Sequence, residues 1–113
     1  MPSGRAKFAV LLTEGAEQDI EAIYDHVRES DGAASAGKLL DALMAVVDSL
    51  AKLPARGSFP PELIDLGIKE YRQVFFGPYR MIYRVVEREV RVYLIADGRR
   101  DMPSLLARRV LGG

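Results

Sequence analysis

Three consecutive segments in the second half of the chain alternate apolar and polar residues with the period of two that is typical of β-strands. They are rich in Val, Ile and Tyr, and we predict strands over residues 71–76, 79–86 and 90–96. Gly77-Pro78 separates the first two segments and Glu87-Arg88-Glu89 separates the last two, so both connections fit hairpin turns. The pattern therefore predicts a three-stranded antiparallel meander.

The same alternation assigns side chains to the two faces of the meander. We expect an apolar, buried face on the third strand made by Val90, Val92, Leu94 and Ala96, which is continued on the second strand by Met81, Tyr83 and Val85. The opposite face then carries Arg80 and Arg84 on the second strand, with Arg91 and Tyr93 on the third. An antiparallel sheet commonly has one solvated face. We expect this solvated face to carry the function.

The first half of the chain has the pattern of two helices. Residues 7–12 predict a short strand, after which Thr13 can cap a helix that runs to about Ser30. Asp31 is the expected cap of a second helix, which ends before Pro54. Its apolar residues recur at spacings of three and four, and with so short a connection they predict an antiparallel helical hairpin packed through Ala36, Leu39, Leu43, Val46, Leu50 and Leu53.

The remaining segments are a loop and a carboxy-terminal helix. Three prolines and two glycines within residues 54–69 predict a long irregular loop. Asp101 is expected to cap a short helix that docks through leucines and leaves Arg108 and Arg109 outside. The whole chain, residues 1–113, is therefore predicted to be one α+β domain with a strand, an antiparallel helical hairpin, a three-stranded antiparallel meander and a short C-terminal helix.

Composition narrows the choice of function. The chain has no cysteine and one histidine, so disulfides are excluded and a zinc site is not expected. We expect no cofactor and no metal. No apolar run is long enough for a membrane span and Met1–Lys7 does not have the pattern of a signal peptide, so we expect a cytoplasmic protein without membrane contacts.

The net charge is zero, but the charges are unevenly distributed along the chain. Residues 1–65 have 6 Lys and Arg against 11 Asp and Glu, whereas residues 66–113 have 10 against 5. Nine of those ten cations are arginine, which suits paired recognition of phosphate or carboxylate. The basic half favours an acidic partner, although a solvated surface explains the charges about as well.

Catalytic patterns are few. We find no paired carboxylates, nucleophile elbow, P-loop or dinucleotide fingerprint, and we interpret His26 as a surface residue of the first helix. Arginines interleaved with tyrosines on an open sheet are able to hold RNA. Cleavage by 2′-hydroxyl attack would also need a proton acceptor and a donor, which this half of the chain does not supply as histidine.

Several segments, in this order, resemble the RelE/ParE toxin superfamily of type II toxin-antitoxin modules. They are AEQDIEAIYDHV, LAKLP, a Pro/Gly loop, EYRQVFFGPYRMIYRVV, VRVYLIADGRRDM and LLARRVL, and together they cover nearly the whole chain. The resemblance implies a helical hairpin on a twisted antiparallel sheet. It also implies a growth-arresting toxin and, as partner, a cognate antitoxin whose extended tail wraps the toxin.

The two branches of the superfamily imply different targets. RelE-like members resemble ribosome-dependent mRNA endoribonucleases, for which the ribosome and mRNA are partners and Arg72, Arg80 and Arg99 are the catalytic candidates. This chain has no Tyr or His after Asp101 and no excess of positive charge, so it is more similar to ParE-like members, which are known as inhibitors of DNA gyrase rather than enzymes. On either interpretation, the expected contacts with a target or antitoxin are made by Arg72, Arg80, Arg84, Arg91, Tyr93, Arg99 and Arg100.

Overall fold

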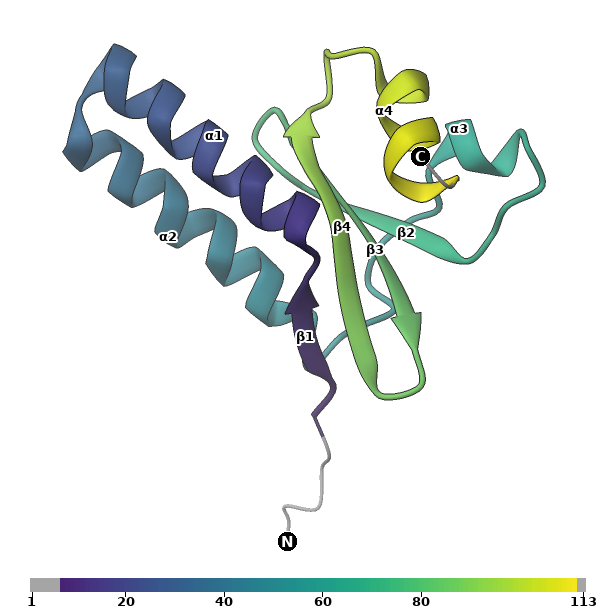
Figure 1. Ribbon diagram of the computed structural model, residues 1–113. Coiled ribbons are helices and arrows are strands. Elements are labelled where there is room, and N and C mark those ends of the chain that lie inside the picture. Colours follow the sequence, from purple (N-terminus) through teal and green to yellow (C-terminus); the bar gives the residue numbers. More distant parts are fainter. Residues whose placement is uncertain (1–6, 112–113) are drawn as a thin grey trace, which may run out of the picture.

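The computed structural model describes residues 7–111 as a four-stranded sheet with helices on both faces (Figure 1). The strands are β1 (Ala9–Leu12), β2 (Tyr71–Phe76), β3 (Tyr79–Val86) and β4 (Glu89–Asp97), and their order across the sheet is β1-β4-β3-β2. β1 runs parallel to β4, whereas β2, β3 and β4 form the predicted antiparallel meander. The predicted α+β class is confirmed. Residues 1–6 of the segment tested for a signal peptide lie outside the described residues.

The helices begin and end at residues that account for their bounds. In α1 (Glu14–Asp31), the hydroxyl of Thr13 accepts a hydrogen bond from the amide of Ala16 at 3.2 Å, which confirms the predicted cap. α2 (Ala33–Ser49) follows after Gly32 alone, whose φ of 96° favours glycine. The prediction that Asp31 caps this helix is wrong, because Asp31 is the last residue of α1 and the chain reverses within one residue.

Two further helices lie on the far side of the sheet from the α1–α2 hairpin (Figure 1). α3 (Pro61–Ile64) is a single turn, so the prediction that residues 54–69 contain no regular structure is wrong there: Pro61 at the first helical position is compatible with a helix start. α4 (Met102–Val110) is capped by Asp101, whose carboxylate accepts from the amide of Ser104 at 3.3 Å, as predicted. No helix within residues 7–111 has the length and apolar character needed to cross a membrane.

The sheet therefore separates two apolar cores. The larger core joins α1 and α2 to one face and includes fully buried Leu43, Met81 and Tyr83. The smaller core joins α3 and α4 to the other face through Leu63, Ile82, Leu94, Leu105 and Leu106. The prediction of one solvated face is wrong over this second core, because the two short helices cover the middle of that face.

A β-bulge explains why the predicted faces of the last strand fail half-way along it. Ile82 pairs with Leu94 and the next residue, Tyr83, pairs with Val92, so Tyr93 is an extra residue in β4. The alternation changes phase at this point. Val90 and Val92 face the α1–α2 hairpin as predicted, but beyond the bulge Leu94 and Ala96 face α4 and Ile95 takes the hairpin side.

Candidate functional site

A groove with a volume of about 440 Å³ lies between α1 and the carboxyl end of β4. Its floor is mainly apolar, formed by Ala22, Ile23, Tyr79, Ile95 and Ala96. Its polar rim comes from α1 and from the turn after β4, and consists of Asp19, His26, Asp97, Arg99 and Arg100. The groove thus brings the predicted arginine corner against the first helix, which is a juxtaposition that the sequence did not indicate.

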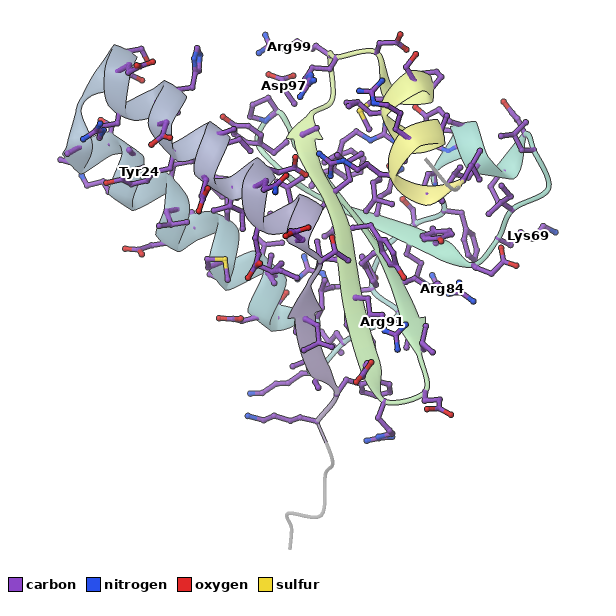
Figure 2. The ribbon with its side chains drawn as sticks, viewed as in Figure 1. Tyr24, Lys69, Arg84, Arg91, Asp97 and Arg99 are labelled. Carbon is purple, nitrogen blue, oxygen red and sulfur yellow. The ribbon has the colours of Figure 1, made fainter. Side chains whose placement is uncertain are left out.

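The corner itself is built around Asp97, the last residue of β4. Its carboxylate accepts from the backbone amide of Arg99 at 2.9 Å and from that guanidinium at 2.6 Å, and Figure 2 shows the two side chains together beyond the strand end. These hydrogen bonds lower the pKa of Asp97 from its usual 3.8 to about 2. Because 83% of the Arg99 side chain remains exposed, the guanidinium is held in position while still accessible to a partner.

We predict that the Asp97 carboxyl titrates with a pKa of about 2 in the folded protein. Because the folded-state pKa is below the ordinary value of 3.8, the stability that Asp97 contributes is complete above pH 3.8 and is lost as the pH falls towards 2. A carboxyl-detected NMR titration measures this directly. In Arg99→Gln the pKa should return towards 3.8, and a wild-type midpoint near 3.8 would contradict the structure.

Two polar groups of the groove, Tyr79 and Asp19, are unsuited to act as a general base. Burial and the neighbouring negative charge of Asp97 raise the pKa of Tyr79, so its phenol stays protonated at neutral pH. Asp19 is already occupied: it accepts from the Nη1 of Arg109 at 2.8 Å and from the backbone amide of Ile95 at 3.0 Å. His26 of α1 is a further titratable side chain on this rim, and the sequence did not indicate that a histidine lies beside the arginine corner.

The prediction that Arg109 lies on the outside of the carboxy-terminal helix is wrong. Arg109 lies partly buried between α4, α1 and β4, where it also donates to the carbonyl of Tyr93 at 3.1 Å. Its ion pair with Asp19 joins residues 90 positions apart and fixes α4 to α1. No local pattern could have indicated this contact.

Arg80 is also less accessible than predicted. It is 8% exposed and its guanidinium is held by both carboxylate oxygens of Glu62, at 2.8 and 2.9 Å, and by the side-chain carbonyl of Gln73 at 3.0 Å. The same hydrogen bonds lower the pKa of Glu62. Since a buried charge needs such partners, Arg80 is committed to holding α3 against the sheet.

The three catalytic candidates of a RelE-like ribonuclease do not converge. Arg72 pairs with Tyr83 in the sheet and so projects from the α1–α2 face, where it donates to the carbonyl of Gly57 at 2.8 Å. Arg80 projects from the α3–α4 face. Arg99 lies in the turn beyond β4. A single phosphate cannot touch both faces of a sheet, so this arrangement does not form one anion site.

The other predicted contact residues do lie together. Arg84 and Arg91 are cross-strand partners on the α3–α4 face, and Figure 2 shows both projecting from that side of the sheet below α4. Tyr93, the bulge residue, meets Tyr71 edge-to-face with ring centres 5.5 Å apart. Arg84 lies over Tyr71 at 5.7 Å from its ring centre. Tyr71 was not among the predicted site residues, although it begins the same meander.

Within residues 7–111 no group of three or more His, Asp or Glu side chains is placed to hold a metal ion.

The predicted arginines and tyrosine lie in three places. Arg99 and Arg100, which we call the corner, form part of the rim of the groove. Arg84, Arg91 and Tyr93 form one cluster on the sheet. Arg72 is bound to the loop at Gly57, and Arg80 is bound to Glu62 of α3.

Two solved structures that are similar to this one come from toxin-antitoxin systems. One is described as a chromosomal ParDE toxin-antitoxin system from P. aeruginosa, with a TM-score of 0.68, 23% identity, and coverage of 80% of this chain and 95% of that one. Another is the toxin-antitoxin complex RelBE2 from Mycobacterium tuberculosis, with a TM-score of 0.59, 18% identity, and coverage of 81% and 92%. At these identities the likeness establishes the fold.

Comparison of the sequence with curated proteins gives no significant match. A family model does match, over residues 10–102, and its description is the ParE toxin of the type II toxin-antitoxin system parDE. The matched range includes β2, β3, β4, both long helices and the corner, and it begins within β1. The chain therefore belongs to the ParE toxin family of type II toxin-antitoxin systems.

Proposed function

We propose that this protein is a toxin that binds and inhibits DNA gyrase, arrests growth from within the cytoplasm, and is neutralised by a cognate antitoxin. Membership of the ParE family supports the toxin role, and two similar structures are described as toxin-antitoxin systems. The ParE resemblance implies gyrase as the target. The observation that carries the choice of a binding inhibitor over a ribonuclease is the burial of Arg80 against Glu62.

Arg80 matters because ribonuclease action would need a free cation at this position. A guanidinium stabilises a pentavalent phosphorane only where it can touch the phosphate oxygens. Here both outer nitrogens donate to Glu62, and Nε donates to Gln73, so the guanidinium is already engaged by protein groups. Since Arg72 projects from the opposite face of the sheet, the arginines do not assemble one site for charge stabilisation.

The corner is the surface that we assign to gyrase. Arg99 and Arg100 are exposed at the mouth of a groove whose floor is apolar. An exposed cation beside a desolvated apolar floor is the composition expected of a protein contact, in which apolar burial supplies affinity and charge supplies orientation. The position of Arg99 is fixed by Asp97 before binding, which lowers the entropy lost on association.

The test is DNA supercoiling by purified gyrase in the presence of the purified protein. We expect loss of supercoiling or accumulation of cleaved DNA, with reversal when antitoxin is added. Normal supercoiling at saturating protein would overturn the proposal. The same preparation should be tested for mRNA cleavage on programmed ribosomes.

Charge reversal at the corner should separate binding from folding. Arg99→Glu combined with Arg100→Glu is expected to weaken gyrase inhibition about tenfold or more, because two exposed cations would become anions at the contact. The thermal stability should change little, since both side chains are exposed. Arg88→Glu combined with Arg108→Glu, two exposed residues in the β3–β4 turn and α4, is the matched control. Equal inhibition by the corner variant and this control would remove the corner from the gyrase contact.

A RelE-like ribonuclease is the second candidate function, because the fold is also similar to that of the RelBE2 complex. It requires cleavage of ribosome-bound mRNA that is lost in Arg80→Gln but retained in Arg108→Gln. Because Arg80 also holds α3, circular dichroism must show that Arg80→Gln is folded. Cleavage with normal gyrase activity would establish this candidate and exclude the first.

A further inference from the structure

Two arginines stand directly opposite each other on the sheet, where like charges repel. Arg84 of β3 and Arg91 of β4 are paired in the register of the antiparallel ladder, and like charges in this position are destabilising. Both are partly exposed on the α3–α4 face. A folded protein that retains such a pair is under electrostatic strain that an anion between the two side chains would relieve.

Carboxylates of the described residues neutralise this pair only in part. Within residues 7–111, arginine forms ion pairs with Glu62, Glu89, Asp97 and Asp19. Arg91 forms an ion pair at 2.9 Å with Glu89, which lies on the same strand and the same face. Arg84 is in none of these ion pairs, and its described contact is with the ring of Tyr71. One carboxylate thus serves two guanidinium groups.

The surroundings of the pair distinguish between two kinds of acidic ligand. Nucleic acid held on a sheet normally stacks its bases on exposed aromatic faces. Here Tyr71 is 8% exposed and meets Tyr93 edge-to-face, so this ring is not offered for stacking. The chain also has no net positive charge to attract a polyanion. A protein segment, which carries separate carboxylates next to apolar side chains, suits these surroundings better than nucleic acid does.

We infer that Arg84 and Arg91 form a carboxylate-binding pair that receives an acidic segment of the antitoxin. This rests on the proposed toxin function for the existence of that partner, but not on gyrase as the target. An Asp or Glu of the antitoxin lies between the two guanidinium groups and accepts hydrogen bonds from both, as paired arginine–carboxylate contacts do. Apolar side chains next to it pack on the edge of Tyr93, which is partly exposed.

The position of the pair also separates it from the corner. Arg84 and Arg91 lie on the α3–α4 face, near the β3–β4 turn, whereas Asp97 and Arg99 lie at the opposite end of β4 (Figure 2). The floor of the corner groove is on the α1 side of the sheet. Antitoxin and gyrase would therefore use separate surfaces, and mutations in one should leave the other intact.

The experiment measures affinity for the antitoxin encoded in the same parDE-type module, by calorimetry on the purified full-length chain. Arg84→Gln combined with Arg91→Gln is expected to raise the Kd about a hundredfold, and the remaining affinity should depend less on salt. The matched control is Arg88→Gln with Arg108→Gln, which removes the same charge from exposed positions in the β3–β4 turn and α4. The control should change the Kd less than about threefold.

Three results would overturn the inference. The first is an unchanged Kd for the antitoxin in the Arg84/Arg91 variant, and the second is an equal rise of that Kd in the control variant. The third is that the Arg84/Arg91 variant no longer binds a fluorescein-labelled single-stranded oligonucleotide while its affinity for the antitoxin is unchanged. The last result would assign the pair to nucleic acid. The melting temperature of the Arg84/Arg91 variant shows whether it is folded, and it should equal or exceed that of the wild type because the repulsion is removed. Arg84→Gln alone is a milder variant that keeps the Arg91–Glu89 ion pair.

Failure of this inference and failure of the proposed function have different signatures. If gyrase is unaffected but antitoxin binding depends on Arg84 and Arg91, the carboxylate-binding pair is confirmed and gyrase is excluded as the target. If gyrase is inhibited equally by the wild type and the Arg84/Arg91 variant while antitoxin binding is unchanged, the target stands and the carboxylate-binding pair falls.

Discussion

Replacing Asp19 by alanine is expected to lower the free energy of unfolding by about 2 to 4 kcal/mol. The substitution leaves the partly buried guanidinium of Arg109 without its carboxylate, and it leaves the backbone amide of Ile95 without its acceptor. Breaking a buried ion pair costs more than the pair contributed, because the remaining charge is still desolvated. The carboxy-terminal helix should therefore loosen first.

Chemical denaturation of the variant and the wild type measures this loss. Asp25→Ala provides the control, since Asp25 is an exposed acid on the same helix and its removal should change stability by less than about 0.5 kcal/mol. A double-mutant cycle with Arg109→Ala isolates the pair. If Asp19→Ala were no more destabilising than the control, the contact between α1 and α4 would not exist in solution.

The second large effect is expected in the larger core. Leu43 on α2 is 1% exposed and packs in the layer between the helical hairpin and the sheet. Leu43→Ala should cost about 2 to 5 kcal/mol, because it removes buried apolar surface and leaves a cavity that the sheet cannot fill by moving. For a domain of this size such a loss lowers the melting temperature by more than about 8 °C.

Leu53→Ala is the matched control for this measurement. Leu53 belongs to the same predicted apolar stripe, but it lies beyond the end of α2 and is 61% exposed. Its truncation should leave the melting temperature within about 4 °C of the wild type. A Leu43→Ala protein that melts with the wild type would show that α2 does not pack on the sheet in this way.

The elements that depend on local periodicity were predictable from the sequence. The bounds of β2 and β3 agree with the prediction, and β4 extends the predicted segment by one residue at each end. Ala36, Leu43 and Leu50 are buried as the spacing of three and four residues indicated. These features follow from side chains whose neighbours along the chain already define the face they occupy.

The second layer was not predictable in the same way, because contacts between distant segments create it. The apolar residues of α4 indicated that it would dock, but not on which face of the sheet. The bulge at Tyr93 has no glycine or proline to mark it, and it reverses the faces of every later residue in β4. The burial of Arg80 depends on Glu62, 18 residues earlier in a segment that looked irregular.

The candidate site shows the same division. The corner residues Arg99 and Arg100 were identified as a pair because they are neighbours in the sequence, but the groove beside them needs α1 and was missed. Arg84 and Arg91 were assigned to the correct face because both precede the bulge. Arg72 was grouped with them by residue type alone, and the register of β2 places it on the opposite face.

The pairing of β1 with β4 also determines when this protein can fold. Ala9–Leu12 aligns with residues 89–92, so the first strand to leave the ribosome waits for the last strand before it gains a neighbour. β4 lies between β1 and β3, and without it the sheet is divided. Such long-range pairing is slow to form. A fragment that ends before residue 89 lacks the strand that joins β1 to β3, so the complete sheet forms only after nearly the whole message has been read.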